Sequence, residues 1–229
     1  MTKNTNKSDN TGSNRRTFLA ATAVGSALLA GCLSSDDEGE ADNGDDDSEP
    51  TAELHERYGY PTTEGEEPPV EPDHEVDLLM DQPEQGPPEF YFEPAGLAVE
   101  SGDVVQFNFN SPDHAVTTFH EAFGRSHRAP EDAEALSSPM MAVGTSWLAE
   151  FEAAGVWDLY CPPHESMGMG MRIVVDEATG PATEPAGEMV YEPGESLPPE
   201  DQLAATYDND ALEPETILED GSVTWDDLK

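Results

Sequence analysis

The sequence predicts an all-β fold, an antiparallel β-sandwich with disordered acidic flanks, from three observations. Short segments that alternate apolar and polar residues follow one another between residues 74 and 176, and Gly and Pro punctuate the joins. Many short strands without a helix pattern between them are typical of a sandwich. The chain on both sides is acidic and Pro-rich, a composition that buries too little apolar surface to order itself.

The strand signal is clearest at residues 103–110, where Val105, Phe107 and Phe109 point to one face and the polar residues between them point to the other. Residues 121–145 interrupt the pattern, and "APEDAEALSS" there fits either a short helix or a surface loop. The expected strands, in chain order, are 74–80, 89–102, 103–110, 114–120, 146–155, 156–161 and 171–176.

The charge balance excludes some partners. The chain has 229 residues, with 9 Lys and Arg against 50 Asp and Glu, and a formal net charge of −41. Such a surface repels nucleic acid and anionic lipid, so neither is an expected partner. Acidity of this kind is typical of a disordered chain or of a folded domain adapted to concentrated salt. Most of the Phe, Trp, Val and Met lies in residues 90–175, which favours a folded protein from a halophile.

The first 31 residues are predicted to be an export signal. Arg15-Arg16, followed by Phe18-Leu19, resembles a twin-arginine signal, and the charge-free run from 17 to 33 is short for a membrane span. "LLAGC" ends at Cys32 and resembles a lipobox, with cleavage before the cysteine and lipid on its sulfur. The alternative is a plain signal peptide with an incidental cysteine.

This interpretation predicts an exported protein, held by lipid on Cys32 at the extracellular face of the cell membrane. Residues 32–73 would form an acidic flexible tether, and residues 176–229 a mostly irregular, acidic extension. Cys161 is then the only thiol left in the folded part, so a disulfide within that part is excluded.

A cluster of soft ligands lies in "LYCPPHESMGMGM", residues 159–171. Cys161 is followed by His164 three residues later and by Met169 eight residues later. One thiolate, two imidazoles and a weak thioether form the trigonal copper site used in electron transfer. His114 is the best candidate for the second imidazole, because it follows an alternating strand and a Pro-containing turn. Met167 and Met171 are interpreted as packing residues.

The loop and the strand before it, "GVWDLYCPPHESMGM", together with "VESGDVVQFNF", closely resemble the cupredoxins, in particular the plastocyanin, pseudoazurin and halocyanin group. The resemblance covers residues 74–175. It implies an eight-stranded Greek-key sandwich with one type 1 copper, held by His114, Cys161, His164 and an axial Met169. It also implies outer-sphere electron transfer to redox proteins of a membrane electron-transport chain, without enzyme activity.

Several alternatives remain open at this point. Cys161 could be a buried core cysteine, although its company of soft ligands argues against this. Copper storage or delivery is the first alternative function, and a copper oxidase or nitrite reductase would need a further copper cluster. His120 and His127 are interpreted as exposed loop histidines, with a second metal site as the alternative. Tyr160 either offers a side route for electrons, as in plastocyanins, or merely covers the sheet.

Overall fold

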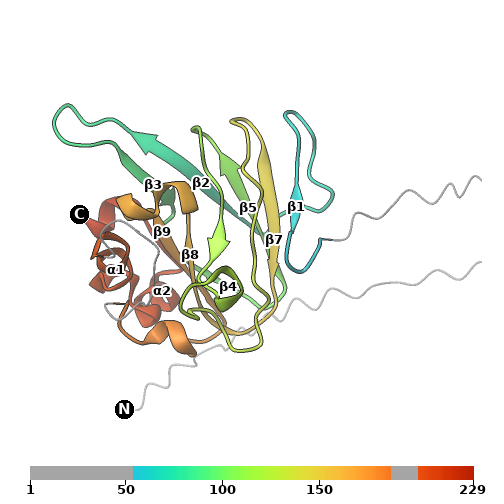
Figure 1. The fold of residues 1–229 in the computed structure, drawn as a ribbon. Coiled ribbons are helices and arrows are strands. Elements are labelled where there is room, and N and C mark those ends of the chain that lie inside the picture. Colours follow the sequence, from blue (N-terminus) through green and yellow to red (C-terminus); the bar gives the residue numbers. More distant parts are fainter. Residues whose placement is uncertain (1–53, 187–200) are drawn as a thin grey trace, which may run out of the picture. The chain divides into compact units, whose positions relative to one another are not determined.

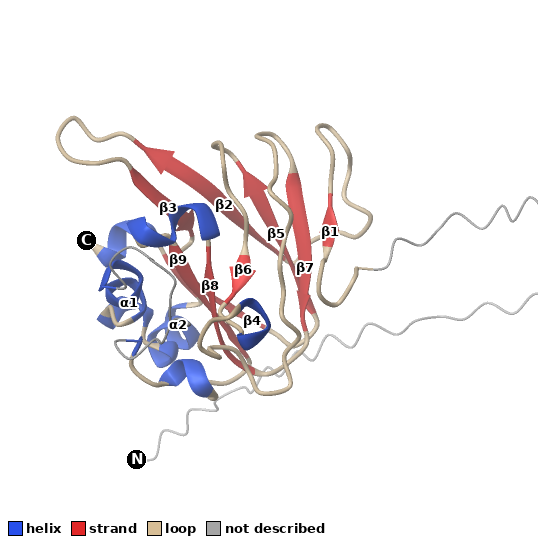
Figure 2. Ribbon diagram, viewed as in Figure 1, coloured by secondary structure: helices blue, strands red, loops and turns tan. Residues whose placement is uncertain are grey.

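The computed structural model describes residues 54–186 and 201–229. The predicted signal and Cys32 lie outside this part of the chain. Two β-sheets form the body of the described protein, and helices α1 and α2 lie against one of them (Figures 1 and 2). Within the described ranges, no helix is both long and apolar enough to cross a bilayer.

The two sheets contain five strands each. In the first sheet the spatial order is β1 (Tyr60–Pro61), β7 (Ser146–Phe151), β5 (Asp103–Phe109), β2 (His74–Asp81) and β3 (Glu89–Glu93). In the second sheet the order is β10 (Ser222–Val223), β4 (Gly96–Val99), β9 (Gly170–Val175), β8 (Gly155–Tyr160) and β6 (Thr117–Thr118). The predicted cupredoxin-like β-sandwich is therefore the observed fold.

The sandwich is not wholly antiparallel, and this corrects the prediction. β2 pairs with β5 in parallel, and β4 pairs with β9 in parallel. The cause lies in the segment 89–102, which was expected to be one strand. It forms β3 in the first sheet and β4 in the second, so the chain changes sheets around Pro94. This crossing supplies the long connection that parallel neighbours need, in place of a helix.

The main core lies between the sheets. Val105, Phe107 and Phe109 of β5 are fully buried in it, as their alternation predicts. Cys161 and Met169 belong to the same buried cluster. The ligand loop is therefore built into the end of the core, where the surrounding packing restricts its movement.

The loop between β6 and β7 is mostly irregular. It holds one short 3-10 turn, η1 (Glu121–Phe123), and then returns to the sandwich through isolated bridges between Ser137 and Thr117 and between Met141 and His114. Of the predicted strand 114–120, only β6 is formed. The loop pairs with the edge residues that a longer strand would have used.

The tether prediction is wrong for residues 54–73, which pack on the sandwich. β1 extends the first sheet by pairing with β7. The indole nitrogen of Trp147 donates a 2.7 Å hydrogen bond to the carbonyl of Tyr58. Gly59 has φ +52°, and a Cβ there would overlap the Trp147 ring. This close approach, which only glycine permits, ties the segment down.

The prediction of a mostly irregular extension is wrong for residues 201–229. This part contains α1 (Asp201–Tyr207), α2 (Pro214–Asp220), β10 and the 3-10 turns η5 (Asp210–Leu212) and η6 (Trp225–Leu228). Leu203, Tyr207, Leu212 and Ile217 are all buried. They are few, but they lie on the outer face of the second sheet, and burial there stabilises short helices that would be marginal alone.

Candidate metal centre

Three buried side chains meet at one end of the sandwich. Cys161 directly follows β8, and His164 lies in the 3-10 turn η2 (Pro162–Met167) that comes next. His114 comes from the turn after β5. Cys161 Sγ is 3.4 Å from His164 Nδ1 and 3.6 Å from His114 Nδ1, and the two Nδ1 atoms are 3.2 Å apart. The structure thus brings together three of the four predicted ligands.

The geometry of this triangle suits a transition metal. Its sides are 3.2–3.6 Å, so its centre lies about 2 Å from each donor atom, which is the length of a metal–imidazole bond. All three residues are buried, and in the described part of the chain they form the only group of three or more potential His, Cys, Asp or Glu ligands. One thiol with two imidazoles is the donor set of a trigonal copper site.

Burial keeps the metal-free cluster neutral. It raises the pKa of the Cys161 thiol to about 11, although hydrogen bonding from the backbone of Ala115 and His164 acts in the opposite direction. Burial, followed by the proximity of His164, lowers the pKa of His114 to about 4. Burial also lowers the pKa of His164. Neutral imidazoles are the form that binds metals.

Ser111 holds His114 from behind, a contact that the sequence reasoning missed. The Ser111 hydroxyl lies 2.7 Å from Nε2 of His114, and this contact holds the ring with Nδ1 toward Cys161. Asp113, directly before the histidine, has φ +66° and turns the chain at this point. A serine three residues before a predicted ligand, in a turn, is the signal that could have indicated this contact.

Two further contacts fix His164. The ring of Phe90, on β3, stacks on its imidazole with centroids 3.8 Å apart and planes 14° apart. Glu165, the next residue, forms a 3.2 Å ion pair with Arg125 from the loop between β6 and β7. These contacts come from residues 39 or more positions away in the sequence, and local pattern could not have indicated them.

Met169 is fully buried beside the three donors. The Cys161 N–H donates to the Met169 carbonyl at 3.0 Å, and the Met169 N–H donates to the His164 carbonyl at 3.3 Å. Met171 is buried in the core as part of β9, whereas Met167 is 44% exposed. The loop methionines therefore occupy three different environments, and Met169 is the one whose backbone is bonded to two of the donor residues.

Three other histidines of the described residues, His74, His120 and His127, lie outside this cluster. The His120 and His127 rings are 4.6 Å apart. Nδ1 of His120 accepts a hydrogen bond from the Ala122 N–H, and Nε2 of His127 lies 3.2 Å from the Pro130 carbonyl oxygen. The described residues place no third ligand with them. His74 bonds to Asp103 at 2.9 Å.

Tyr160 points away from the donor cluster. Its side chain is 3% exposed and packs in a separate cluster with Phe119, Leu203 and Tyr207. The C-terminal extension contributes the last two of these residues. Tyr160 is therefore itself covered by other side chains.

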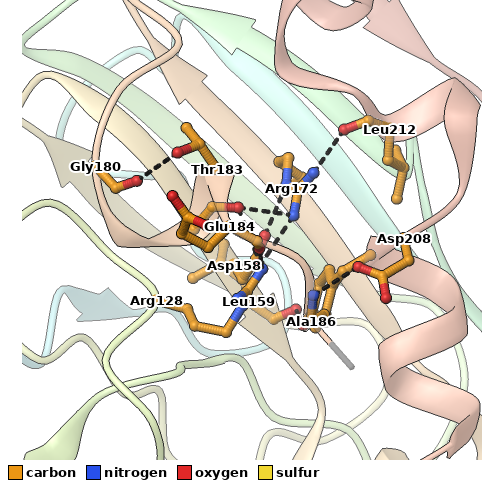
Figure 3. A network of polar contacts seen from close by, with 12 residues as sticks. Arg128, Asp158, Leu159, Arg172, Gly180, Thr183, Glu184, Ala186, Asp208 and Leu212 are labelled. Atoms are coloured by element: carbon orange, nitrogen blue, oxygen red, sulfur yellow. Dashed lines mark hydrogen bonds and ion pairs between the residues drawn. The ribbon is translucent and has the colours of Figure 1, made fainter. Parts of the chain in front are cut away.

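A second polar cluster lies on this outer side of the second sheet (Figure 3). Asp158 of β8 is fully buried and pairs with Arg128 at 2.7 Å and with Arg172 at 2.8 Å. The two guanidinium groups also donate to backbone carbonyls of Ala182, Glu184 and Leu212. These arginines hold the extension onto the sandwich.

Comparison with known proteins agrees with the site. Residues 82–176 match the family model of copper binding proteins, plastocyanin/azurin family. The chain is 32% identical over 87 residues to the chloroplastic plastocyanin of Tetradesmus obliquus, which covers 37% of this chain and 57% of that protein. The chain thus spans little more than half of this relative's length.

Solved structures of the same kind are also similar to the chain. A pseudoazurin from Sinorhizobium shares 26% identity with a TM-score of 0.42, over 58% of this chain and 89% of that one. The pseudoazurin of Methylobacterium extorquens shares 22% identity with a TM-score of 0.36, over 64% and 95%.

The fold is a cupredoxin-like β-sandwich, and its buried donor set suits copper. The match to the plastocyanin/azurin family of copper-binding proteins covers residues 82–176, less than half of the chain. The β1 segment, strand β2, α1 and α2 lie outside this match.

Proposed function

We propose that this protein is a mononuclear type 1 copper electron carrier and not an enzyme. The observation that carries the proposal is the convergence of His114, Cys161 and His164 in a buried triangle next to Met169. A bound copper ion would supply a one-electron couple between Cu(I) and Cu(II). The chain's contribution is to hold the same donor positions for both oxidation states, which keeps rearrangement on electron transfer small.

Rigidity of the donors supports this role. Ser111 orients His114, Phe90 stacks on His164, and the loop closes on itself through the bonds between Cys161, His164 and Met169. Two proline residues, Pro162 and Pro163, further restrict the backbone of the turn. Such preorganisation suits a site that must not relax between two redox states.

The route for electrons follows from burial. His164 keeps 7% of its surface exposed, whereas Tyr160 is covered by Phe119 and by residues of α1. We therefore assign electron entry and exit to the His164 edge. The redox partners would be proteins of a membrane electron-transport chain that dock over this edge.

The proposed location rests on the N-terminal sequence alone. Twin-arginine export and lipid attachment at Cys32 would place the domain at the extracellular face of the membrane. The strongly acidic composition supports a halophilic origin. Mass spectrometry of the native membrane-bound protein tests the anchor, because a mature chain that begins at unmodified Cys32, or upstream of it, contradicts the lipid.

Visible absorption of the copper-loaded protein tests the central proposal. We expect one copper per chain and, in the oxidised form, an intense thiolate-to-copper band toward the red end of the spectrum. Cys161→Ser removes the thiolate and should abolish the band. Met167→Leu, at an exposed position of the same loop, is the matched control and should retain it. A colourless copper complex of the unmodified protein would contradict the proposal.

Copper storage or delivery predicts different behaviour. A delivery site opens to release its ion, whereas here Cys161 and Met169 are fully buried and His164 is 7% exposed. We expect fast electron self-exchange and slow loss of copper to a metal-free acceptor. Slow self-exchange with ready copper transfer would favour delivery.

A further inference from the structure

Helix α1 of the C-terminal extension touches the ligand loop on both sides of the donors. The Thr206 hydroxyl lies 2.9 Å from the carbonyl oxygen of Gly168, the residue before Met169. The Tyr207 hydroxyl donates a 2.6 Å hydrogen bond to the carbonyl of Leu159, two residues before Cys161. Two adjacent residues of α1 thus bind the loop backbone, one near Met169 and the other near Cys161.

The Gly-Met-Gly sequence at 168–170 is fitted to this helix. A Cβ on Gly168 would lie 3.2 Å from the Gln202 carbonyl oxygen and from the Thr206 hydroxyl. A Cβ on Gly170 would lie 2.8 Å from both a Leu203 methyl group and the Tyr207 hydroxyl. The absence of side chains on both sides of Met169 lets α1 approach the loop backbone directly.

The helix itself is firmly placed. Tyr207 is 2% exposed, and its ring lies 6.0 Å and 5.8 Å from the guanidinium carbons of Arg128 and Arg172, which both pair with Asp158. Asp208, directly after the helix, accepts a 2.6 Å hydrogen bond from the N–H of Ala186. Figure 3 shows Arg128, Asp158 and Arg172 together with the contact between Asp208 and Ala186. Because these contacts fix α1 on the sandwich, α1 can hold the loop at a fixed position relative to the sandwich.

We infer that α1 is a positioning element for the copper loop, with Thr206 and Tyr207 as its positioning residues. By holding the carbonyls of Gly168 and Leu159, they fix where Met169 and Cys161 stand relative to one another. The inference rests on the proposed function for its effect on copper, but the positioning itself is a property of the metal-free chain. The family match ends at residue 176, so this device lies outside it.

The two hydroxyl groups can be removed without changing side-chain volume much, by Thr206→Val and Tyr207→Phe in the full-length protein. Thr206→Ser is the rescue variant, because it keeps a hydroxyl. The Thr206 hydroxyl also lies 3.1 Å from the Gln202 carbonyl of its own helix, so the matched control must lose a comparable local bond. Thr183→Val does so, since Thr183 bonds to the Gly180 carbonyl at 2.8 Å away from the loop.

Amide hydrogen exchange of the metal-free protein gives the first measurement. The Cys161 and Met169 amides are bonded within the loop. Thr206→Val and Tyr207→Phe should speed their exchange about tenfold relative to core amides of β5. Thr206→Ser and Thr183→Val should leave the rates within about twofold of the unmodified protein. Uniform acceleration across the domain, or no acceleration at the loop, would overturn the inference.

The copper-loaded protein gives the second measurement. The intensity ratio of the visible copper bands and the reduction potential should change in Thr206→Val and Tyr207→Phe, and return in Thr206→Ser. Unchanged spectra and potentials, in a protein that is coloured, would show that α1 only covers the sheet. A colourless unmodified protein would refute the copper proposal instead, and the exchange measurement would then decide the positioning inference alone.

Discussion

One buried polar cluster is centred on Asp158 and another on Cys161, three residues later in the chain, on the opposite side of the second sheet. The two clusters differ in whether the protein's own groups satisfy all of their polar atoms. Around Asp158, every interaction shown in Figure 3 joins a donor to an acceptor. Both carboxylate oxygens receive guanidinium groups, from Arg128 and Arg172. The remaining arginine contacts go to backbone carbonyls. This cluster is complete without any further group.

The cluster around Cys161 differs, because its facing atoms are all potential metal ligands. Two imidazole nitrogens and a sulfur face one another within 3.6 Å. Ser111 contacts Nε2 of His114, so Nδ1 is the nitrogen that faces the sulfur. A cation at the centre of this triangle could bind all three atoms, because each is a metal-ligating type. Burial of polar groups thus does not indicate function by itself, whereas a buried set of converging metal-ligating atoms does.

The largest expected effect separates the two clusters by stability. Asp158→Asn leaves Arg128 and Arg172 buried without their anion, and removal of one partner of such a group costs about 3–5 kcal/mol. Denaturant unfolding in molar salt measures this loss. Glu131→Gln, at an exposed acid, is the control and should change the free energy of unfolding by less than about 0.5 kcal/mol. A similarly small effect of Asp158→Asn would contradict the structural role of the charge cluster.

Copper should stabilise the protein only by binding to the Cys161 cluster. With free copper at about 100 times its dissociation constant, binding adds about 2.7 kcal/mol to the free energy of unfolding. Cys161→Ser should lose most of this increment, because the thiolate is gone. Thermal unfolding with and without copper measures the difference. An undiminished increment in Cys161→Ser would mean that copper binds elsewhere.

Ser111→Ala tests the support behind the donors. It removes the hydrogen bond that orients His114, and loss of such outer contacts lowers metal affinity about 10- to 100-fold. Competition with a chelator measures the affinity. Ser101→Ala removes a hydroxyl that donates to the Glu152 carbonyl instead, and it should leave the affinity unchanged. Equal losses in both variants would assign the effect to general destabilisation.

What the sequence predicts well depends on local chemistry. The alternation in 103–110 predicts β5 because a half-buried strand repeats every two residues. The soft side chains of Cys161 and His164, three positions apart, predict a metal loop for a similar reason, since one turn must bring them together. The choice of His114 required the assumption that a distant turn lies next to the Cys161 loop. The pairing of the strands brings the two together.

The parts that the sequence did not predict depend on distant surfaces. α1 and α2 are seven residues each, too short to form from intrinsic propensity. They form where Leu203 and Ile217 find apolar surface on a sheet built from other segments. Phe90 reached His164 in the same way, from another strand. In both cases the information lies in the packing of two segments, which no local window contains.

The smallest expected effect concerns Met169, at the edge of the Cys161 cluster. Met169 is fully buried next to Cys161 and His164, whereas Met167 is 44% exposed and Met171 belongs to the core. Cu(I) tolerates a lower coordination number than Cu(II), so removal of a weak fourth donor should raise the reduction potential. A difference of about 1 kcal/mol between the two oxidation states corresponds to a shift on the order of 40 mV.

Met169→Leu should therefore keep copper and colour but show a raised potential, because leucine fills a similar volume without a donor atom. Redox titration followed by visible absorption measures both properties on one sample. Met167→Leu, in the same loop, and Met171→Leu, in β9, are the controls and should shift the potential by less than about 10 mV, well below that estimate. A large shift in either control, with none in Met169→Leu, would move the axial assignment to another methionine and leave the three buried donors as they are.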